Sequence, residues 1–239
     1  MKIRGERECK DCGSWWSYYE TGAVACPECG SMRSVGVDDR TEHTASAVTF
    51  DLTDPRGRID DVPLVDLADD VESRCGEYVR RVGFVDAGQL RELDDTYLGA
   101  AELRHVAAEL ARSMRVTDDE EYYFLELLRG VDAGERPLPT AVPDSLHAPR
   151  GLAAAAAVDA YRSDVRRYLD EHPDPAVRRL LGRVDEHRKR VDALDGDVPP
   201  REAESLVDAA RAIGRSLARD DETALAEARS RLDSLAALE

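Results

Sequence analysis

The chain has 239 residues, of which 42% are hydrophobic, so it can bury a core of ordinary size and does not have the composition of a disordered protein. Aromatic residues make up only 5%, so alanine and leucine dominate the apolar set and favour packed helices. The longest run without a polar side chain, residues 151–158, is far shorter than the roughly 18 residues of a membrane span. A membrane-spanning protein is therefore excluded. The charged start MKIRGERE has no apolar signal segment, and we expect a cytoplasmic protein.

The formal net charge is −17, and only three of the 33 basic residues are lysines. This acidic, lysine-poor composition predicts adaptation to molar salt, where a Debye length of about 3 Å screens the repulsion between like charges. The charge is unevenly placed: residues 1–45 carry 6 basic and 8 acidic side chains, whereas residues 46–149 carry 11 and 23. An anionic partner would therefore prefer the ends of the chain over its acidic middle.

Residues 1–40 are predicted to form a small β ribbon around four cysteines. The segment SWWSYY at 14–19 is typical of a strand, and Gly22 can take the positive φ of a turn. AVAC at 23–26 then predicts a returning strand, and residues 31–37 a third one.

The cysteines stand in two CxxCG motifs, which predict a metal site. Cys9 and Cys12 form one pair and Cys26 and Cys29 the other, with thirteen residues between the pairs. Two such turns give four thiolates in a closed tetrahedral arrangement, which suits structural zinc, and the following glycines let backbone N–H groups face the sulfurs. In a reducing compartment this pattern favours metal over disulfides. We expect one Zn²⁺ per chain.

Both tryptophans of the chain lie between the two cysteine pairs. On a strand, Trp15 and Tyr19 would share one face and Trp16 and Tyr18 the other. One face would then cover the ribbon core or dock onto the rest of the chain, and the other could contact a partner.

The rest of the chain predicts an all-α body. Residues 41–62 are a linker with one short strand at 46–52, and residues 63–133 form a helical region with a capping box at Thr117 and Glu120. Residues 134–150 are a proline-rich linker. Residues 151–239 are predicted to form four helices, near 152–171, 175–194, 201–218 and 221–238, arranged as helical hairpins or a four-helix bundle. Met114 is predicted to face inwards at the end of a helix that Asp95 or Thr96 caps at its N-terminus. The leftover Cys75 is predicted to be a partly buried free thiol.

The motifs CxxCG and CPxCG with flanking strands resemble the zinc ribbon of the transcription factor B type over about residues 6–37. Nothing after residue 62 resembles the paired cyclin-like repeats of that factor. MKIRGERECKDCG together with LDDTYLGAAELRHVA is similar to an uncharacterised haloarchaeal zinc-ribbon family, which implies no particular activity.

The same motifs also resemble the iron site of rubredoxins, so a mononuclear iron electron-transfer protein is the alternative. A rubrerythrin-like di-iron bundle would need two Glu-x-x-His motifs, and only Glu102 and His105 provide one. Four thiolates alone do not decide the metal, and we prefer zinc to iron.

No catalytic motif and no small-molecule substrate site is evident in the sequence. The arginine-rich turns from Arg162 to Arg190 are interleaved with acids, which favours a salt-bridged helix surface over a nucleic-acid face. The sequence therefore predicts a non-catalytic module that contacts an unidentified protein or nucleic acid, with a possible role in transcription.

Overall fold

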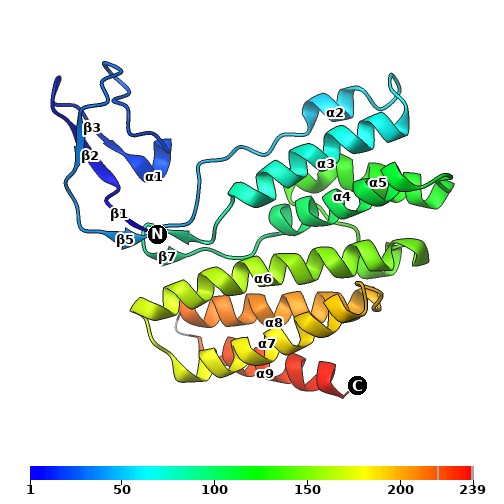
Figure 1. Cartoon of the computed structure of the whole chain (residues 1–239). Helices are drawn as coiled ribbons and strands as arrows, with labels where there is room; N and C mark the ends of the chain where they lie inside the picture. The colour runs from blue at the N-terminus through cyan, green and yellow to red at the C-terminus, as the bar shows by residue number, and fades with distance from the viewer. Residues whose placement is uncertain (220, 238–239) are drawn as a thin grey trace.

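A computed structural model describes residues 1–219 and 221–237 of the chain. Small N-terminal strands are followed by an all-α body, as predicted, and the two parts lie side by side (Figure 1). The strands are β1 (Lys2–Ile3), β2 (Glu6–Cys9), β3 (Trp15–Ser17), β4 (Ser34–Gly36), β5 (Thr41–Glu42), β6 (Val85–Asp86) and β7 (Gln89–Leu90). The helices are α1 (Tyr18–Thr21), α2 (Thr53–Gly57), α3 (Leu64–Arg81), α4 (Asp95–Arg112), α5 (Asp118–Gly130), α6 (His147–Glu171), α7 (Pro175–Ala193), α8 (Pro200–Arg219) and α9 (Glu222–Ala236).

The ribbon is built on a three-stranded antiparallel sheet in the order β3-β2-β4. The predicted third strand is present, but the predicted strand at 23–26 is absent. That segment is held by hydrogen bonds from side chains and not by a ladder of backbone hydrogen bonds. The indole N–H of Trp16 donates to the Ala23 carbonyl at 3.0 Å. The Ser34 hydroxyl likewise donates to the Val24 carbonyl at 2.7 Å.

The predicted strand over the aromatic residues also ends early, because the chain turns into the single-turn helix α1 after Ser17. Gly22 closes that turn with a φ of 64°, and its N–H donates to the Tyr18 carbonyl at 2.8 Å. The predicted pairing of Trp15 with Tyr19 on one strand face is therefore wrong. Left-handed conformation at Gly22 was expected, but it caps a helix and does not close a hairpin.

The ribbon is fixed to the body by residues 41–45. β5 pairs with β1, and the next residues run along the hairpin β6–β7, where the Thr44 N–H donates to the Val85 carbonyl at 2.8 Å. The buried carboxylate of Asp164 on α6 accepts from both the Thr44 hydroxyl and the Phe84 N–H, at 2.6 and 2.7 Å. Ribbon, hairpin and helical body thus meet at one carboxylate.

Residues 46–52 form no strand, contrary to the prediction of one in the 41–62 linker. Their apolar side chains pack onto α3 instead: Leu52 is fully buried, and the ring of Phe50 stacks on Tyr78 with 4.3 Å between centroids. The alternation of apolar and polar residues at 46–52 therefore reflects packing against helix α3 and not pairing with a second strand.

Helix α4 lies at the centre of the body and is buried on two sides. Tyr97, Leu98 and Ala101 belong to the core formed with α6 to α9, whereas Val106 and Leu110 belong to the core formed with α3 and α5. Its cap is Asp94, one residue before the predicted position, and it ends at Arg112. Met114 therefore lies beyond the helix and is fully exposed, not inward as predicted.

The remaining helices lie close to their predicted positions, and the capping box at Thr117 and Glu120 is confirmed. Cys75 is fully buried among the side chains of α3 and α4, deeper than the partial burial predicted for it. Residues 134–150, where we expected a linker, contain short 3₁₀ turns and the first turn of α6. Two arginines of this segment, Arg136 and Arg150, have buried side chains. Among the described helices, none is both long and apolar enough to cross a membrane.

Candidate metal centre

Each CxxCG motif folds into the same turn. In the first, the Cys9 N–H donates to the Ser14 carbonyl at 2.9 Å, and the Gly13 N–H donates to the Cys9 carbonyl at 3.1 Å. The second repeats this pattern from Cys26 to Ser31 and from Gly30 to Cys26, both at 2.9 Å. Gly13 and Gly30 have φ angles of 78° and 72°, as predicted for residues that close such turns.

The two turns bring Cys9, Cys12, Cys26 and Cys29 together, with all four sulfurs within 4.8 Å of one another. The Sγ atoms of Cys9 and Cys29 are 3.7 Å apart, and those of Cys12 and Cys26 are 3.6 Å apart. A regular tetrahedron with metal–sulfur bonds of 2.3 Å has an edge of about 3.8 Å. These two separations match that edge, and all four sulfurs are close enough together to hold one ion.

The protonation behaviour of the sulfurs also favours a cation. Ser14, through its hydroxyl and its backbone N–H, lowers the pKa of Cys12 to about 6 by stabilising the thiolate. The Ser31 N–H is the largest single influence on Cys29 and lowers its pKa, but the sulfurs of Cys12, Cys26 and Cys9 together with desolvation outweigh it and raise that pKa to about 12. Four thiolates this close repel one another unless a positive ion offsets their charge.

Burial differs between the two sulfurs of each turn. Cys9 and Cys26 are buried and, with Trp16, make up the ribbon's own apolar core, whereas Cys12 and Cys29 are exposed. Three side chains cannot supply the burial that holds a domain together. A bound ion is thus the natural source of stability for this part of the chain.

The four aromatic residues predicted as a possible partner site lie in different environments. Trp16 is buried against the cysteines, and Trp15 is exposed over 62% of its surface. Tyr19 docks at the junction, where its hydroxyl lies 2.7 Å from that of Thr41 and its ring lies 4.8 Å from the ring of His43. Tyr18 is partly buried and lines a surface pocket. Of the four, Trp15 alone is free to meet a partner with most of its side chain.

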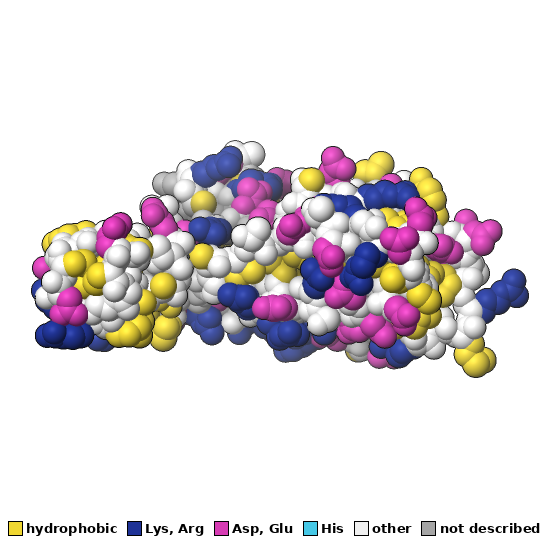
Figure 2. Space-filling view, turned by 90° about the horizontal axis from the view of Figure 1, so that it is seen from above, with side chains coloured by type: hydrophobic (Ala, Val, Ile, Leu, Met, Phe, Trp, Pro, Cys, Tyr) yellow, Lys and Arg dark blue, Asp and Glu magenta, His cyan; other side chains and the backbone are white. Residues whose placement is uncertain are grey.

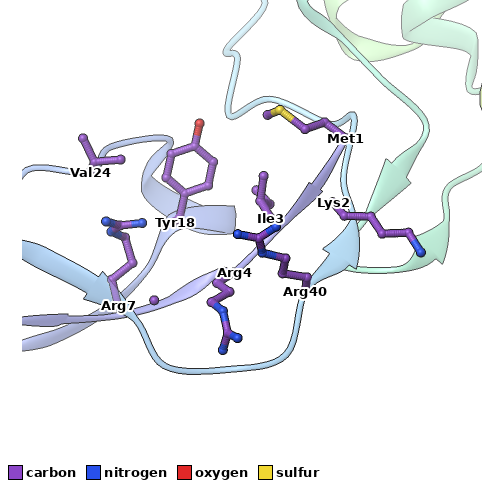
Figure 3. A pocket seen from close by; sticks show the side chains of 9 residues that line it. Met1, Lys2, Ile3, Arg4, Arg7, Tyr18, Val24 and Arg40 are labelled. Carbon is purple, nitrogen blue, oxygen red and sulfur yellow. The ribbon is translucent and has the colours of Figure 1, made fainter.

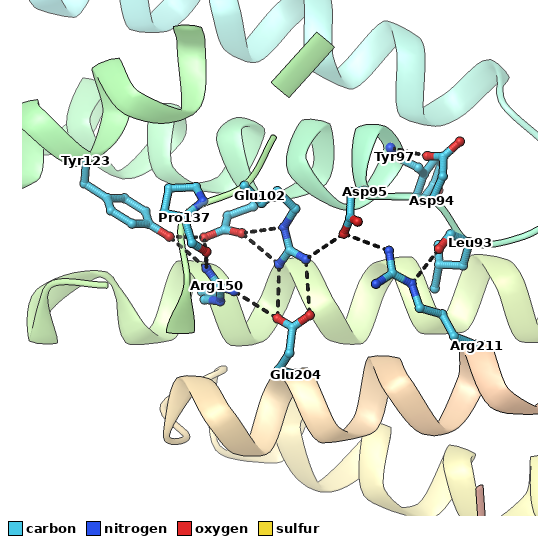
Figure 4. Close-up of polar contacts among 11 residues, drawn as sticks. Leu93, Asp94, Asp95, Tyr97, Glu102, Tyr123, Pro137, Arg150, Glu204 and Arg211 are labelled. Atoms are coloured by element: carbon cyan, nitrogen blue, oxygen red, sulfur yellow. Dashed lines mark hydrogen bonds and ion pairs between the residues drawn. The ribbon is translucent and has the colours of Figure 1, made fainter. Parts of the chain in front are cut away.

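A buried network of charged residues was not predicted, and Figure 4 shows it between α4, α6 and α8. Glu102, singled out in the sequence only as part of a Glu-x-x-His motif, accepts from Arg136 at 3.0 Å and from Arg150 at 3.0 Å. Arg150 also donates to Glu204 at 2.9 Å and to the Tyr123 hydroxyl at 2.9 Å. The paired acids and bases lie 34 to 68 positions apart, so no local pattern could have revealed them.

The arginine-rich turns of α6 and α7 lie on a salt-bridged surface, as predicted. Arg162 pairs with Asp185 at 3.1 Å, Arg167 with Asp164 at 2.9 Å, and Arg188 with Asp185 at 3.0 Å. Since these cations are neutralised within the body, they leave little free charge for a nucleic acid.

Sequence and geometry together define a class: a ribbon with four cysteines able to hold a metal ion, fixed to a two-core helical body. The chain belongs to DUF7117, a family of unknown function, whose family model matches residues 1–232. No curated protein and no solved structure matches it.

Proposed function

We propose that this protein is a non-catalytic interaction module whose ribbon holds one Zn²⁺ and presents its outer face to a protein partner. The proposal includes adaptation to molar salt, an origin in a haloarchaeon and a cytoplasmic location. It also includes a role related to transcription, which is the role that the ribbon's resemblance suggests. The metal keeps the ribbon folded, and the helical body carries it.

The observation that carries the proposal is the distribution of exposed hydrophobic side chains. Six of the eleven large ones among the described residues lie in the first 37 residues, and Figure 2 shows hydrophobic side chains at the end of the molecule that the ribbon forms. Those on the ribbon are Met1, Trp15, Val24, Met32, Val35 and Val37. Exposed apolar side chains concentrated on one module are typical of an interaction surface.

Two of these residues share the outer face of the sheet. Trp15 on β3 and Val35 on β4 both lie directly opposite Glu8 on β2, so their side chains project to the same side. Val35 is 39% exposed. An exposed tryptophan and an aliphatic side chain on one sheet face, on either side of Glu8, are typical of the aromatic and apolar composition of protein-binding surfaces.

The identity of the metal is tested by metal analysis and the visible spectrum of protein purified in molar KCl without added metal. We expect about one zinc per chain and no colour. One iron per chain with a thiolate charge-transfer band would instead support the electron-transfer alternative and remove the interaction module as the primary function.

The contact face is tested with a photo-crosslinking residue next to position 15 in cells that express the chain. We expect a recurrent protein partner that is lost in Trp15→Ser and kept in Tyr122→Ser. Tyr122 is the matched control, because it is an aromatic residue of the helical body with 64% exposure, against 62% for Trp15. Retention of the partner by Trp15→Ser would refute the assignment of this face.

A further inference from the structure

A pocket of about 440 Å³ opens between the ribbon and its junction with the body. Its walls come from the N-terminal strands, α1 and the segment before β5, as Figure 3 shows. In that view the guanidinium groups of Arg7 and Arg40 point into the space from opposite sides, with the Tyr18 ring beside it. Lys2 and Arg4 line the rim, and their charged ends point away.

The lining of this pocket differs in charge from the rest of the molecule. Its lining has four cationic side chains and no carboxylate, in a chain with 50 acidic and 33 basic residues; of the four, Lys2 pairs with Glu171 outside the pocket at 2.5 Å, and the three arginines carry the argument. Four other pockets of the described chain each include at least one carboxylate, contributed by Glu92, Glu186, Asp51 with Glu77, or Glu126 with Glu135. A concave site that excludes acids in so acidic a protein attracts anions.

The arginines of the pocket also lack the acidic partners that neutralise cations elsewhere on the ribbon. Among the described residues, the Arg7 guanidinium donates only to Ser34, and its Nη2 lies 2.9 Å from the Ser34 hydroxyl. The Arg4 guanidinium donates to the backbone carbonyl of Asp38. Outside the pocket, Arg33 pairs with Asp11 at 2.7 Å and Lys10 with Glu8 at 2.7 Å. Arg7 is thus oriented by a neutral serine and keeps its charge available for a ligand.

We propose that this pocket binds single-stranded nucleic acid, with a backbone phosphate held between Arg7 and Arg40 and a base against the Tyr18 ring. Guanidinium groups match phosphate oxygens in geometry, and an aromatic ring beside a cationic groove is how proteins hold single strands without reading their sequence. The bases of a duplex are stacked inside the helix and cannot reach such a ring. An acidic peptide would satisfy the arginines but would leave the ring without a flat partner.

The arginines of the pocket lie on the other side of the sheet from Trp15 and Val35, although Met1 and Val24, two of the exposed apolar side chains of the ribbon, also line the pocket. Arg7 lies opposite Trp16 and Gly36 in the sheet register, whereas Trp15 lies opposite Glu8, so the pocket and Trp15 are on opposite faces of the sheet. The nucleic-acid site therefore goes beyond the proposed function, and either one can fail without the other.

The test is fluorescence anisotropy of labelled 12-nucleotide oligo(dT) and oligo(U) with full-length, metal-loaded protein over a series of KCl concentrations. We expect binding that weakens as salt rises, since each phosphate contact releases counterions. Arg40→Gln should reduce the slope of log affinity against log salt by about one, and Tyr18→Leu should weaken binding at least about fivefold. Arg33→Gln, a change of the same charge on the ribbon outside the pocket, should leave both unchanged, as should Trp15→Ser.

Three outcomes would overturn the proposal. The first is no binding by wild-type protein whose helical circular dichroism and metal content are intact in the same buffer. The second is an equal loss of affinity in Arg33→Gln and Arg40→Gln, which would indicate general electrostatic attraction. The third is displacement of the oligonucleotide by poly-glutamate at a matching charge concentration with no effect of Tyr18→Leu, which would identify the pocket as a site for acidic protein segments.

Discussion

Glu102 is the residue whose replacement should reveal most about what holds the helical body together. Its side chain is fully buried and accepts hydrogen bonds from the Tyr123 hydroxyl, from Arg136 and from Arg150. Glu102→Gln keeps the shape of the side chain but removes the charge that the two guanidinium groups share. The Arg150 side chain is 2% exposed and that of Arg136 is 7% exposed, so water cannot replace the lost carboxylate.

Breaking a buried ion pair by removing one partner costs about 3–5 kcal/mol, because the other charge stays buried and uncompensated. Glu204 moderates the loss, since it remains 2.9 Å from Arg150. With a urea m-value of about 3 kcal/mol/M, we expect the midpoint of unfolding to fall by about 1 to 1.5 M. The measurement is urea unfolding of wild type and variant, followed by circular dichroism at 222 nm in 2 M KCl.

Glu109→Gln provides the matched control on the same helix. Glu109 pairs with Arg112 at 3.2 Å, but both side chains are largely exposed, so this change should alter the free energy of unfolding by less than about 0.5 kcal/mol. Raising KCl from 1 to 3 M should leave the Glu102→Gln effect unchanged, because salt does not screen a buried pair. A loss below about 1 kcal/mol for Glu102→Gln, or an equal loss for both variants, would refute the argument that this network holds the two cores together.

Three further predictions concern pH, metal and salt. Burial, with help from Arg104 and Arg112, lowers the pKa of His105 to about 4, so the unfolded chain binds the proton first as pH falls below about 6.5. The free energy of unfolding should therefore be at its full value above that pH and decline by up to about 3 kcal/mol towards pH 4. Urea titrations of His105→Gln should show a smaller decline. Parallel pH profiles of wild type and variant would contradict this. Both tryptophans lie in the ribbon, whose core has only three side chains. Chelation of the metal should therefore shift tryptophan emission to the red while the 222 nm circular dichroism of the helical body persists. Loss of both signals together would show that the body depends on the metal. With a net charge of −17, lowering KCl from 2 to 0.1 M should reduce the melting temperature by roughly 5–10 °C, and a melting temperature independent of salt would remove the argument for salt adaptation.

The sequence predicted those features of the fold that depend on neighbouring residues. The two cysteine turns need only five residues each, with a glycine at positive φ, and both form as expected. The capping box at Thr117 is equally local. Helices with a continuous apolar stripe, such as α7 and α8, were placed within about one to two residues because the period of 3.6 is repeated over several turns.

Features that depend on distant residues were missed. The segment at 46–52 alternates like a strand but has no strand to pair with, and it packs its apolar side chains on α3. The hairpin β6–β7 lies within the region predicted as helical and was not predicted, since its strands have only two residues each and depend on contacts with Thr44 and Asp164. The Glu102 network and the cationic pocket likewise join residues that are far apart or that look unremarkable one by one. Such juxtapositions are products of the fold and leave no trace in a local pattern.

The junction at Asp164 has a consequence for the order of events during synthesis. All ligands of the candidate metal centre and all strands of the ribbon lie within the first 42 residues, so the ribbon can take up its ion as soon as this stretch leaves the ribosome. Its docking partners emerge much later: Val85 lies 41 positions after Thr44, and Asp164 lies 120 positions after it. We expect the nascent chain to carry a finished, untethered ribbon while the helices are still being made. The pocket and the apolar face of that ribbon would then be accessible to their ligands before the rest of the molecule exists.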